Sequence, residues 1–370
     1  MLGNSFEALE HGNHGGNMKK SNLMIPAAAL LGLLASCGGT VNSMKADVFI
    51  YQYSDTYIGT VRTALAADLK AKGIDATFKD AAGVQQTQTQ QIDTAIAGKT
   101  KLLITNLVEP VAAGENIAKK AKDANVPCIF FNREVENSTV TKATYPDNCF
   151  VGTDPDQAGY MQGDILADAI ITADGKINPV YDHNGDGKIN YVMLRADESN
   201  AEANGRTKYS VEKCNARLAE KSLPALKQLG TDFNANWSKD EAKTAMDNFI
   251  TAHHLTGETA IEAVIANNDD MALGAVLSLV QAGYNKAGTE NDPAKTVCVV
   301  GVDATAAAQE SIRNKQMYGT VKQDAAAMAA CISALAANKL NGKDYLAGTD
   351  YKWDSEDVHK IRIPYAKFIG

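Results

Sequence analysis

Val48-Phe49-Ile50-Tyr51 begins the part of the chain whose pattern decides the fold. From here short apolar runs alternate with longer amphipathic segments. The pattern predicts strands at 48–51, 75–78, 102–105 and 128–131, and helices at 58–72, 86–97 and 111–124. Short apolar strands with helices between them are typical of a parallel sheet that is covered on both faces. We therefore expect an α/β fold with a doubly wound parallel sheet.

The same alternation starts again after the turn sequence Tyr145-Pro146-Asp147-Asn148. It predicts strands at 149–152, 191–194, 263–266 and 297–302, and helices at 157–171, 207–218, 241–249 and 271–280. An Ala-rich helix at 325–340 and a last short strand at 361–364 follow, and no low-complexity linker separates the parts. We expect two lobes joined by several close crossings. Their predicted bounds are 44–152 plus about 325–360 for the first lobe, and 153–324 plus about 361–370 for the second.

Composition excludes one class of partner. The chain has 370 residues and a net charge of -8, and its lysines form no basic stripe. A nucleic-acid partner is therefore not expected.

The first 36 residues have the character of a leader. Residues 1–17, with His11 and His14, look like an upstream extension, and residues 18–36 resemble a bacterial lipoprotein signal that ends at Leu34-Ala35-Ser36-Cys37. The resemblance implies cleavage before Cys37, a lipid on its thiol, and export to the periplasm or the outer surface of the cytoplasmic membrane. The alternative is a plain secretory signal followed by an incidental cysteine.

Five further cysteines show no zinc-type spacing. Cys128 and Cys298 lie in apolar strand-like runs, where buried free thiols are common. A disulfide among Cys149, Cys214 and Cys331 is compatible with export, but the sequence does not pair them.

The stretch from Asp182 to Asn190, Asp-His-Asn-Gly-Asp-Gly-Lys-Ile-Asn, has the spacing of an EF-hand-type calcium loop. Position twelve, where an EF-hand has a bidentate Glu, is Met193 within a predicted strand. Either a distant carboxylate completes the site or the stretch is an Asx-rich turn. The expected ligands within the loop are the side chains of Asp182, Asn184, Asp186 and Asn190 and the carbonyl of Lys188.

Three motifs at strand ends carry a family resemblance: Phe130-Phe131-Asn132, Ile265-Ala266-Asn267-Asn268-Asp269 and Gly301-Val302-Asp303. With Asn106-Leu107-Val108, Val151-Gly152-Thr153-Asp154 and the calcium-type loop, the chain from about Val48 onward resembles the type I periplasmic sugar-binding proteins, in the calcium-loop subgroup that binds galactose or glucose. The resemblance implies two lobes on a three-segment hinge. It also implies that Glu262 is the remote carboxylate of a structural Ca²⁺ site.

The resemblance further implies ten sugar contacts. Six match the family pattern: Asp55, Asn132, Arg206, Trp237, Asn268 and Asp303. Four depart from the family pattern: the family has Phe where this chain has Tyr57, His where it has Asn200, Asp where it has Glu202, and Asn where it has Gln323. These departures leave the identity of the hexose open.

The chemistry of these residues suits a sugar independently of the family resemblance. The crevice of an open α/β sheet lies outside the carboxyl ends of its strands, where these Asn and Asp residues fall. Carboxylates, amides and Arg match hydroxyl groups, and Tyr57 and Trp237 suit the apolar ring faces. Taken singly, Asn or Asp at a strand end is commonly a helix cap, and we expect that role for Asp269. Trp237 alone would suit a core and Arg206 a solvated helix face.

The implied function is capture of a hexose, glucose or galactose, by a monomer that delivers it to an ABC permease. The alternative is a sensor lipoprotein that presents the sugar to a chemoreceptor or sensor kinase. An enzyme is not expected, because no nucleophile motif is present, although Glu202 and Asp303 would be candidates for a glycosidase pair. A DNA-binding regulator would need a helix-turn-helix before Val48, where the export-type leader lies.

Overall fold

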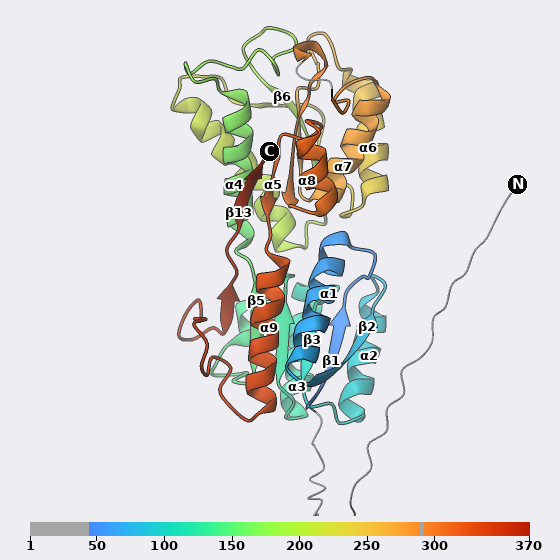
Figure 1. Ribbon diagram of the computed structural model, residues 1–370, viewed down its shortest axis with the longest axis vertical. Coiled ribbons are helices and arrows are strands. Elements are labelled where there is room, and N and C mark those ends of the chain that lie inside the picture. Colours follow the sequence, from blue (N-terminus) through green and yellow to red (C-terminus); the bar gives the residue numbers. More distant parts are fainter. Residues whose placement is uncertain (1–43, 289–291) are drawn as a thin grey trace, which may run out of the picture. The chain divides into compact units, whose positions relative to one another are not determined.

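The computed structural model describes residues 44–288 and 292–370, and these residues belong to one compact unit (Figure 1). This unit contains two lobes, each built on its own β-sheet. The predicted leader, with Cys37, lies outside the described residues.

The first lobe contains a six-stranded sheet with the order β12-β5-β4-β3-β1-β2. All its neighbouring strands are parallel, as predicted. Its strands are β1 (Met44–Ile50), β2 (Ile74–Asp80), β3 (Leu103–Thr105), β4 (Cys128–Phe131), β5 (Asn148–Gly152) and β12 (Lys360–Arg362). Its helices are α1 (Thr56–Ala71), α2 (Gln85–Ala97), α3 (Pro110–Asp123), α9 (Ala325–Leu340) and the 3₁₀ turn η1 (Asn137–Val140).

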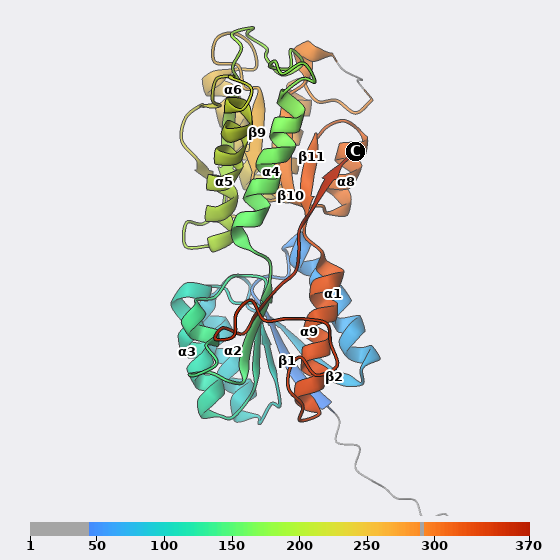
Figure 2. The ribbon, with the colours of Figure 1, turned by 90° about the vertical axis from the view of Figure 1, so that its left-hand side faces the viewer.

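Alternation along β1 explains why this sheet has two apolar faces. Val48 and Ile50 pack in a core cluster with α1 and α9, whereas Phe49 points to a second cluster with α2 and α3. Figure 2 shows the sheet between these two pairs of helices. Burial on both faces is why the strand reads as a continuous apolar run in the sequence.

The second lobe contains a seven-stranded sheet with the order β13-β11-β10-β9-β6-β7, and β8 also pairs with β6. Only β13 among the strands described there is antiparallel to its neighbour. The strands are β6 (Asn190–Arg195), β7 (Lys227–Gln228), β8 (Phe233–Asn234), β9 (Ala263–Ala266), β10 (Cys298–Asp303), β11 (Gly319–Lys322) and β13 (Ala366–Ile369). The helices are α4 (Pro155–Ile170), α5 (Ala201–Ala219), α6 (Lys239–His253), α7 (Asp269–Gln281), α8 (Ala306–Arg313) and the 3₁₀ turn η2 (Pro293–Lys295).

Glycines let α4 and α5 touch backbone to backbone. A Cβ on Gly159 would lie 2.4 Å from the carbonyl oxygen of Gly205, and one on Gly163 would lie 2.4 Å from that of Ser210. Such distances are far inside van der Waals contact, so only glycine fits. This close packing sets the position of the first turns of α5, which carry the predicted sugar contacts Glu202 and Arg206 and follow a third, the cap Asn200.

Three segments connect the lobes, and the last one differs from the prediction. The chain crosses after β5, after β11, and between β12 and β13. We predicted that residues from about 361 onward belong to the second lobe, but β12 pairs with β5 of the first lobe, with Ile361 opposite Val151. The crossing therefore follows Arg362. Strand β13 was not predicted, because four mostly exposed residues are too few to give a periodic signal.

Other differences concern polar segments. Helix α5 begins at Ala201 rather than at 207, because Asn200 caps it and its first turn is polar. Helix α8 and strand β11 were not predicted.

The five cysteines outside the leader are all free and buried, so the disulfide considered among Cys149, Cys214 and Cys331 is absent. Within the described ranges no helix has the length and apolarity needed to span a membrane.

Candidate functional site

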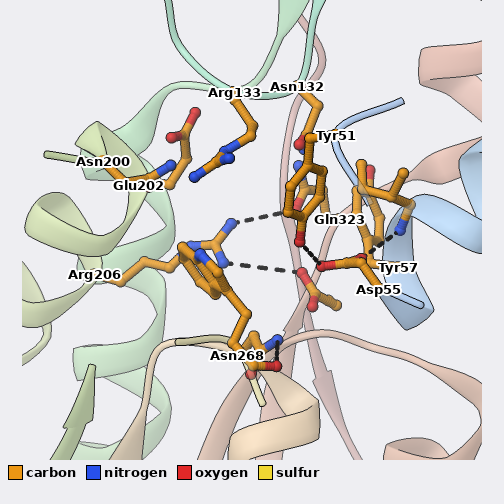
Figure 3. A pocket seen from close by; sticks show the side chains of 13 residues that line it. Tyr51, Asp55, Tyr57, Asn132, Arg133, Asn200, Glu202, Arg206, Asn268 and Gln323 are labelled. Carbon is orange, nitrogen blue, oxygen red and sulfur yellow. Dashed lines mark hydrogen bonds and ion pairs between the residues drawn. The ribbon is translucent and has the colours of Figure 1, made fainter. Parts of the chain in front are cut away.

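One pocket brings together all ten predicted sugar contacts (Figure 3). Residues from both lobes line it. The lining residues are Tyr51, Asp55, Tyr57, Ile58, Asn132, Arg133, Asn200, Glu202, Arg206, Trp237, Asn268, Asp303 and Gln323.

Three of these residues are also helix caps. The Oδ1 atoms of Asp55, Asn200 and Asn268 each accept a hydrogen bond from the backbone N–H of the residue three positions later, at 2.7, 2.9 and 2.9 Å. Each cap uses one oxygen, which fixes the side chain, and all three residues still line the pocket. The capping and binding interpretations of these residues are therefore compatible.

The cap of α7 is Asn268, and our prediction that Asp269 has this role is wrong. Asp269 lies one residue further on, fully buried, and accepts from the hydroxyl of Thr320 at 2.6 Å and from the backbone N–H of Thr305 at 2.7 Å. Burial raises the pKa of Asp269 to about 7. Its carboxyl joins α7 to β11 and to the loop after β10.

Arg206 is the buried cation of the site. Its Nη1 donates to the carbonyl of Asn267 at 2.9 Å and lies 4.0 Å from Oδ1 of Asp303. Its guanidinium carbon lies 5.6 Å from the ring centre of Trp237. Burial raises the pKa of Asp303 well above its usual range, and the Arg206 charge opposes that shift.

Glu202 connects the second lobe to the first across the pocket. Its Oε1 accepts from the backbone N–H of Glu134 at 2.9 Å. Burial, followed by the charge of Glu134, raises the pKa of the Glu202 carboxyl. The Glu134 carboxylate itself is held by Lys360 at 2.5 Å and by Arg362 at 2.6 Å, both on β12.

Three buried polar atoms of the pocket have no hydrogen-bond partner. They are Oε2 of Glu202, Nε of Arg206 and Nε2 of Gln323. A buried polar atom without a partner costs about 1–3 kcal/mol, so each favours a ligand that supplies one. One of these atoms accepts and two donate. A molecule with several hydroxyl groups satisfies both kinds.

Aromatic side chains and strained backbone complete the pocket. Tyr57 is buried, with its hydroxyl 4.0 Å from Sδ of Met328, and Trp237 is half-buried. Asn132, Trp237 and Asp303 have positive φ angles of 63°, 61° and 125°. Such conformations cost on the order of 1–3 kcal/mol and cluster at ligand sites.

Sequence reasoning missed Tyr51, Ile58 and Arg133. The Tyr51 hydroxyl donates to Oδ2 of Asp55 at 2.5 Å, and the Arg133 guanidinium lies 4.6 Å from the Tyr51 ring centre. Arg133 directly follows Asn132 after β4, and Tyr51 directly follows β1. The carboxyl ends of these strands were the available signal for Tyr51 and Arg133, although neither residue belongs to a motif of the family resemblance.

The calcium-type loop lies in the second lobe, and Glu262 folds against it as predicted from the resemblance. Its Oε1 accepts from the backbone N–H of His183 at 2.8 Å and of Asn184 at 3.4 Å, and its Oε2 accepts from that of Asn190 at 2.7 Å. Burial raises the pKa of Glu262 to about 7, and these N–H donors oppose the rise. Asp182 caps the turn by accepting from Gly185 and Gly187.

The donor set of the loop fits a hard cation. All the predicted ligands are oxygen donors, and the buried Oδ1 of Asn190 has no hydrogen-bond partner. Gly185 and Gly187 have φ angles of 72° and 76°, which the turn requires. Over residues 44–288 and 292–370 no group of three or more His, Cys, Asp or Glu side chains is arranged to hold a metal, so amide and carbonyl oxygens would have to complete the coordination.

The chain is similar to known binding proteins over most of its length. A family model for the periplasmic binding protein domain matches residues 46–344. The D-galactose/methyl-galactoside binding periplasmic protein MglB of Haemophilus influenzae is 31% identical over 349 residues, which cover 94% of this chain and 96% of that protein. Ribose import binding protein RbsB of Escherichia coli is 23% identical, over 83% of this chain and 88% of that protein.

Solved structures agree in fold. A solute-binding protein of an ABC transporter from Bacillus halodurans C-125, with bound myo-inositol, has a TM-score of 0.66 and 24% identity and covers 88% of this chain and 94% of its own. A second solute-binding protein, from Actinobacillus succinogenes 130z with bound D-allose, has a TM-score of 0.69 and 21% identity. The match covers 88% of this chain and 97% of that protein. The predicted family and fold are confirmed, and the relatives are binding proteins rather than enzymes, as predicted. The chain belongs to the periplasmic binding protein family.

Proposed function

We propose that this protein captures a hexose, glucose or galactose, outside the cytoplasm and delivers it to an ABC importer. The observation that supports this most is the pocket in which all ten predicted contacts lie, with one unpartnered acceptor and two unpartnered donors. A neutral polyol meets these atoms without adding charge to a site that already pairs Arg206 with Asp303. The full-length similarity to MglB supports the same class of ligand.

Closure of the lobes on the sugar follows from how the contacts are divided. Asp55, Tyr57 and Asn132 belong to the first lobe, whereas Arg206 and Asp303 belong to the second. Only an arrangement with the lobes together allows a ligand to touch both sets, so a ligand stabilises that arrangement. A closed complex presents both lobes to a permease at once.

A binding panel tests the proposal. Isothermal titration and thermal shift should be measured with D-galactose, D-glucose, D-allose, D-ribose and myo-inositol, each with and without a chelator. We expect the tightest binding and the largest stabilisation with galactose or glucose. Tighter binding of ribose or inositol would reassign the ligand, and absence of binding throughout would contradict the proposal.

A structural Ca²⁺ in the second lobe is part of the proposal. The ligands would be the side chains of Asp182, Asn184, Asp186, Asn190 and Glu262 and the carbonyl of Lys188. Its charge would offset the carboxylates of the loop. Because none of these residues lines the sugar pocket, the ion would stabilise the lobe and not contact the sugar.

Lipid anchoring at Cys37 is the last part. It rests on the run Leu34-Ala35-Ser36-Cys37 behind a short apolar segment. Metabolic labelling with a fatty-acid analogue should mark the protein, and Cys37→Ala should abolish the label. Labelling of the Cys37→Ala protein would exclude this anchor.

A further inference from the structure

The three segments that connect the lobes each contribute one buried polar side chain to the same place. Thr153 follows β5, Gln323 follows β11, and Tyr365 lies between β12 and β13. Their exposed fractions are 0%, 3% and 5%. Hinge segments change their backbone angles when lobes rotate, so side chains on all three respond to the same motion.

Hydrogen bonds join these side chains to one another through Arg206. The hydroxyls of Tyr365 and Thr153 lie 2.8 Å apart. Nη2 of Arg206 donates to the Tyr365 hydroxyl at 3.1 Å and to Oε1 of Gln323 at 3.2 Å. A sugar-pocket guanidinium is therefore linked to every crossing between the lobes.

These contacts limit which donors of Arg206 remain for a ligand. Nη1 donates to the Asn267 carbonyl and lies near Asp303, and Nη2 donates to Tyr365 and Gln323. Two N–H groups make no hydrogen bond: the second one on Nη1, and the one on Nε, which is buried. Because a guanidinium is planar and rigid, fixing Nη1 and Nη2 also fixes the direction of Nε.

We propose that Tyr365 is a positioning residue that couples the hinge to the sugar pocket. This inference rests on the proposed function. Tyr365 does not line the pocket, and its hydroxyl holds Arg206 in its ligand-binding orientation only while the crossings at Thr153 and Tyr365 are arranged as in this structure. The orientation of Arg206 and the closed hinge are then parts of one state, and a ligand that uses Nε stabilises both.

Two variants and a control separate this role from simple packing. Tyr365→Phe removes the hydroxyl and keeps the ring, and Thr153→Val removes its hinge partner without touching Arg206. Tyr345→Phe is the control, because Tyr345 is another buried tyrosine, whose hydroxyl donates to the Asp147 carbonyl within the first lobe. Affinity and dissociation rate for D-galactose and D-glucose are measured by titration and stopped flow, and melting temperature without sugar is measured for each protein.

We expect Tyr365→Phe to weaken binding about tenfold, mainly through faster dissociation, because it leaves an arginine donor unpaired. Thr153→Val should weaken binding roughly threefold, and the double variant should be no weaker than Tyr365→Phe alone, since both act through one hydroxyl. Tyr345→Phe should lower the melting temperature and leave affinity unchanged.

Wild-type affinity in both Tyr365→Phe and Thr153→Val would overturn the inference and leave the proposed function intact. An equal loss of affinity in Tyr345→Phe would also overturn it, because the effect would then be general destabilisation. If the wild-type protein bound neither sugar nor any other member of the panel, the proposed function would fail and this inference with it.

Discussion

The sugar pocket and the calcium-type loop are both polar clusters beside buried strands, yet they satisfy their atoms in different ways. In the loop, the carboxylates of Asp182 and Glu262 accept from backbone N–H groups of the same lobe. In the pocket, side chains from both lobes meet, and buried atoms of Glu202, Arg206 and Gln323 remain without partners. The carboxylates of the loop are therefore held by its own backbone, although Oδ1 of Asn190 stays without a partner, whereas the unpartnered atoms of the pocket come from both lobes or their crossings.

This difference separates two kinds of ligand. A site that is already held by its own backbone needs a ligand only to neutralise charge, so the ligand adds stability to one lobe. A site shared by two lobes with unpartnered atoms uses its ligand to choose between arrangements of the lobes. The four predictions below test whether the two sites act independently, from the largest expected effect to the smallest.

Arg206→Met should have the largest effect. Removing one partner of a buried ion pair leaves Asp303 without its opposite charge, and we expect sugar affinity to fall about 100-fold, roughly 3 kcal/mol. Titration calorimetry measures this loss, and the stabilisation by calcium should remain. Arg195→Met is the matched control, because Arg195 contacts Glu198 and Asn204 outside the pocket. A parallel loss of the calcium response would show that the two sites are coupled.

Trp237→Ala should follow, with a loss of about 2 kcal/mol, or roughly 30-fold in affinity, on the scale of a buried aromatic anchor. Small-angle scattering should show less compaction at the same sugar concentration. Trp353→Ala is the control, because Trp353 stacks on His359 in the first lobe, with ring centres 4.5 Å apart. Unchanged affinity in Trp237→Ala would mean that this ring only packs against the second lobe.

Glu262→Gln should act on the loop alone. At calcium concentrations about 100 times its Kd, the wild-type protein should gain ~2.7 kcal/mol, and a tenfold weaker site would lose roughly 1.4 kcal/mol of that gain. Thermal unfolding with calcium and with chelator measures the difference in the absence of sugar. Glu258→Gln is the control, since its backbone carbonyl meets Asn184 but its side chain is exposed. Full calcium stabilisation in Glu262→Gln would assign the carboxylate elsewhere.

Thr56→Val should have the smallest effect. The Thr56 hydroxyl donates to Oδ2 of Asp270 at 2.6 Å, from the first lobe to the second, in an exposed position. An exposed hydrogen bond contributes about 0.5 kcal/mol, so sugar affinity should fall about twofold. Thr60→Val is the control, because the Thr60 hydroxyl bonds only to the backbone of its own helix, at the Thr56 carbonyl. Equal affinity in both variants would mean that this contact does not favour closure.

The pocket residues were predicted mainly through the family resemblance, and their position after buried strands supports only some of them. Asn132 follows β4 and Asp303 ends β10, so strand patterns alone place each residue at the carboxyl edge of its own lobe's sheet. Tyr51 and Arg133 occupy equivalent positions and were missed, because neither carries a motif. Asp269 was misassigned because two adjacent polar residues both suit a cap, and only the path of the backbone selects Asn268.

The sequence by itself determined the α/β class, the repeated lobes, the strand-end polar residues and the calcium-type spacing, because each depends on residues that are close together in the chain. The tertiary structure decided where the last crossing falls, which thiols stay unpaired and which groups hold Arg206. Arg206 and Tyr365 are 159 residues apart, and no local pattern links them. Their contact exists only because three crossings between two folded lobes bring buried side chains to one place, where a polar atom must find a partner.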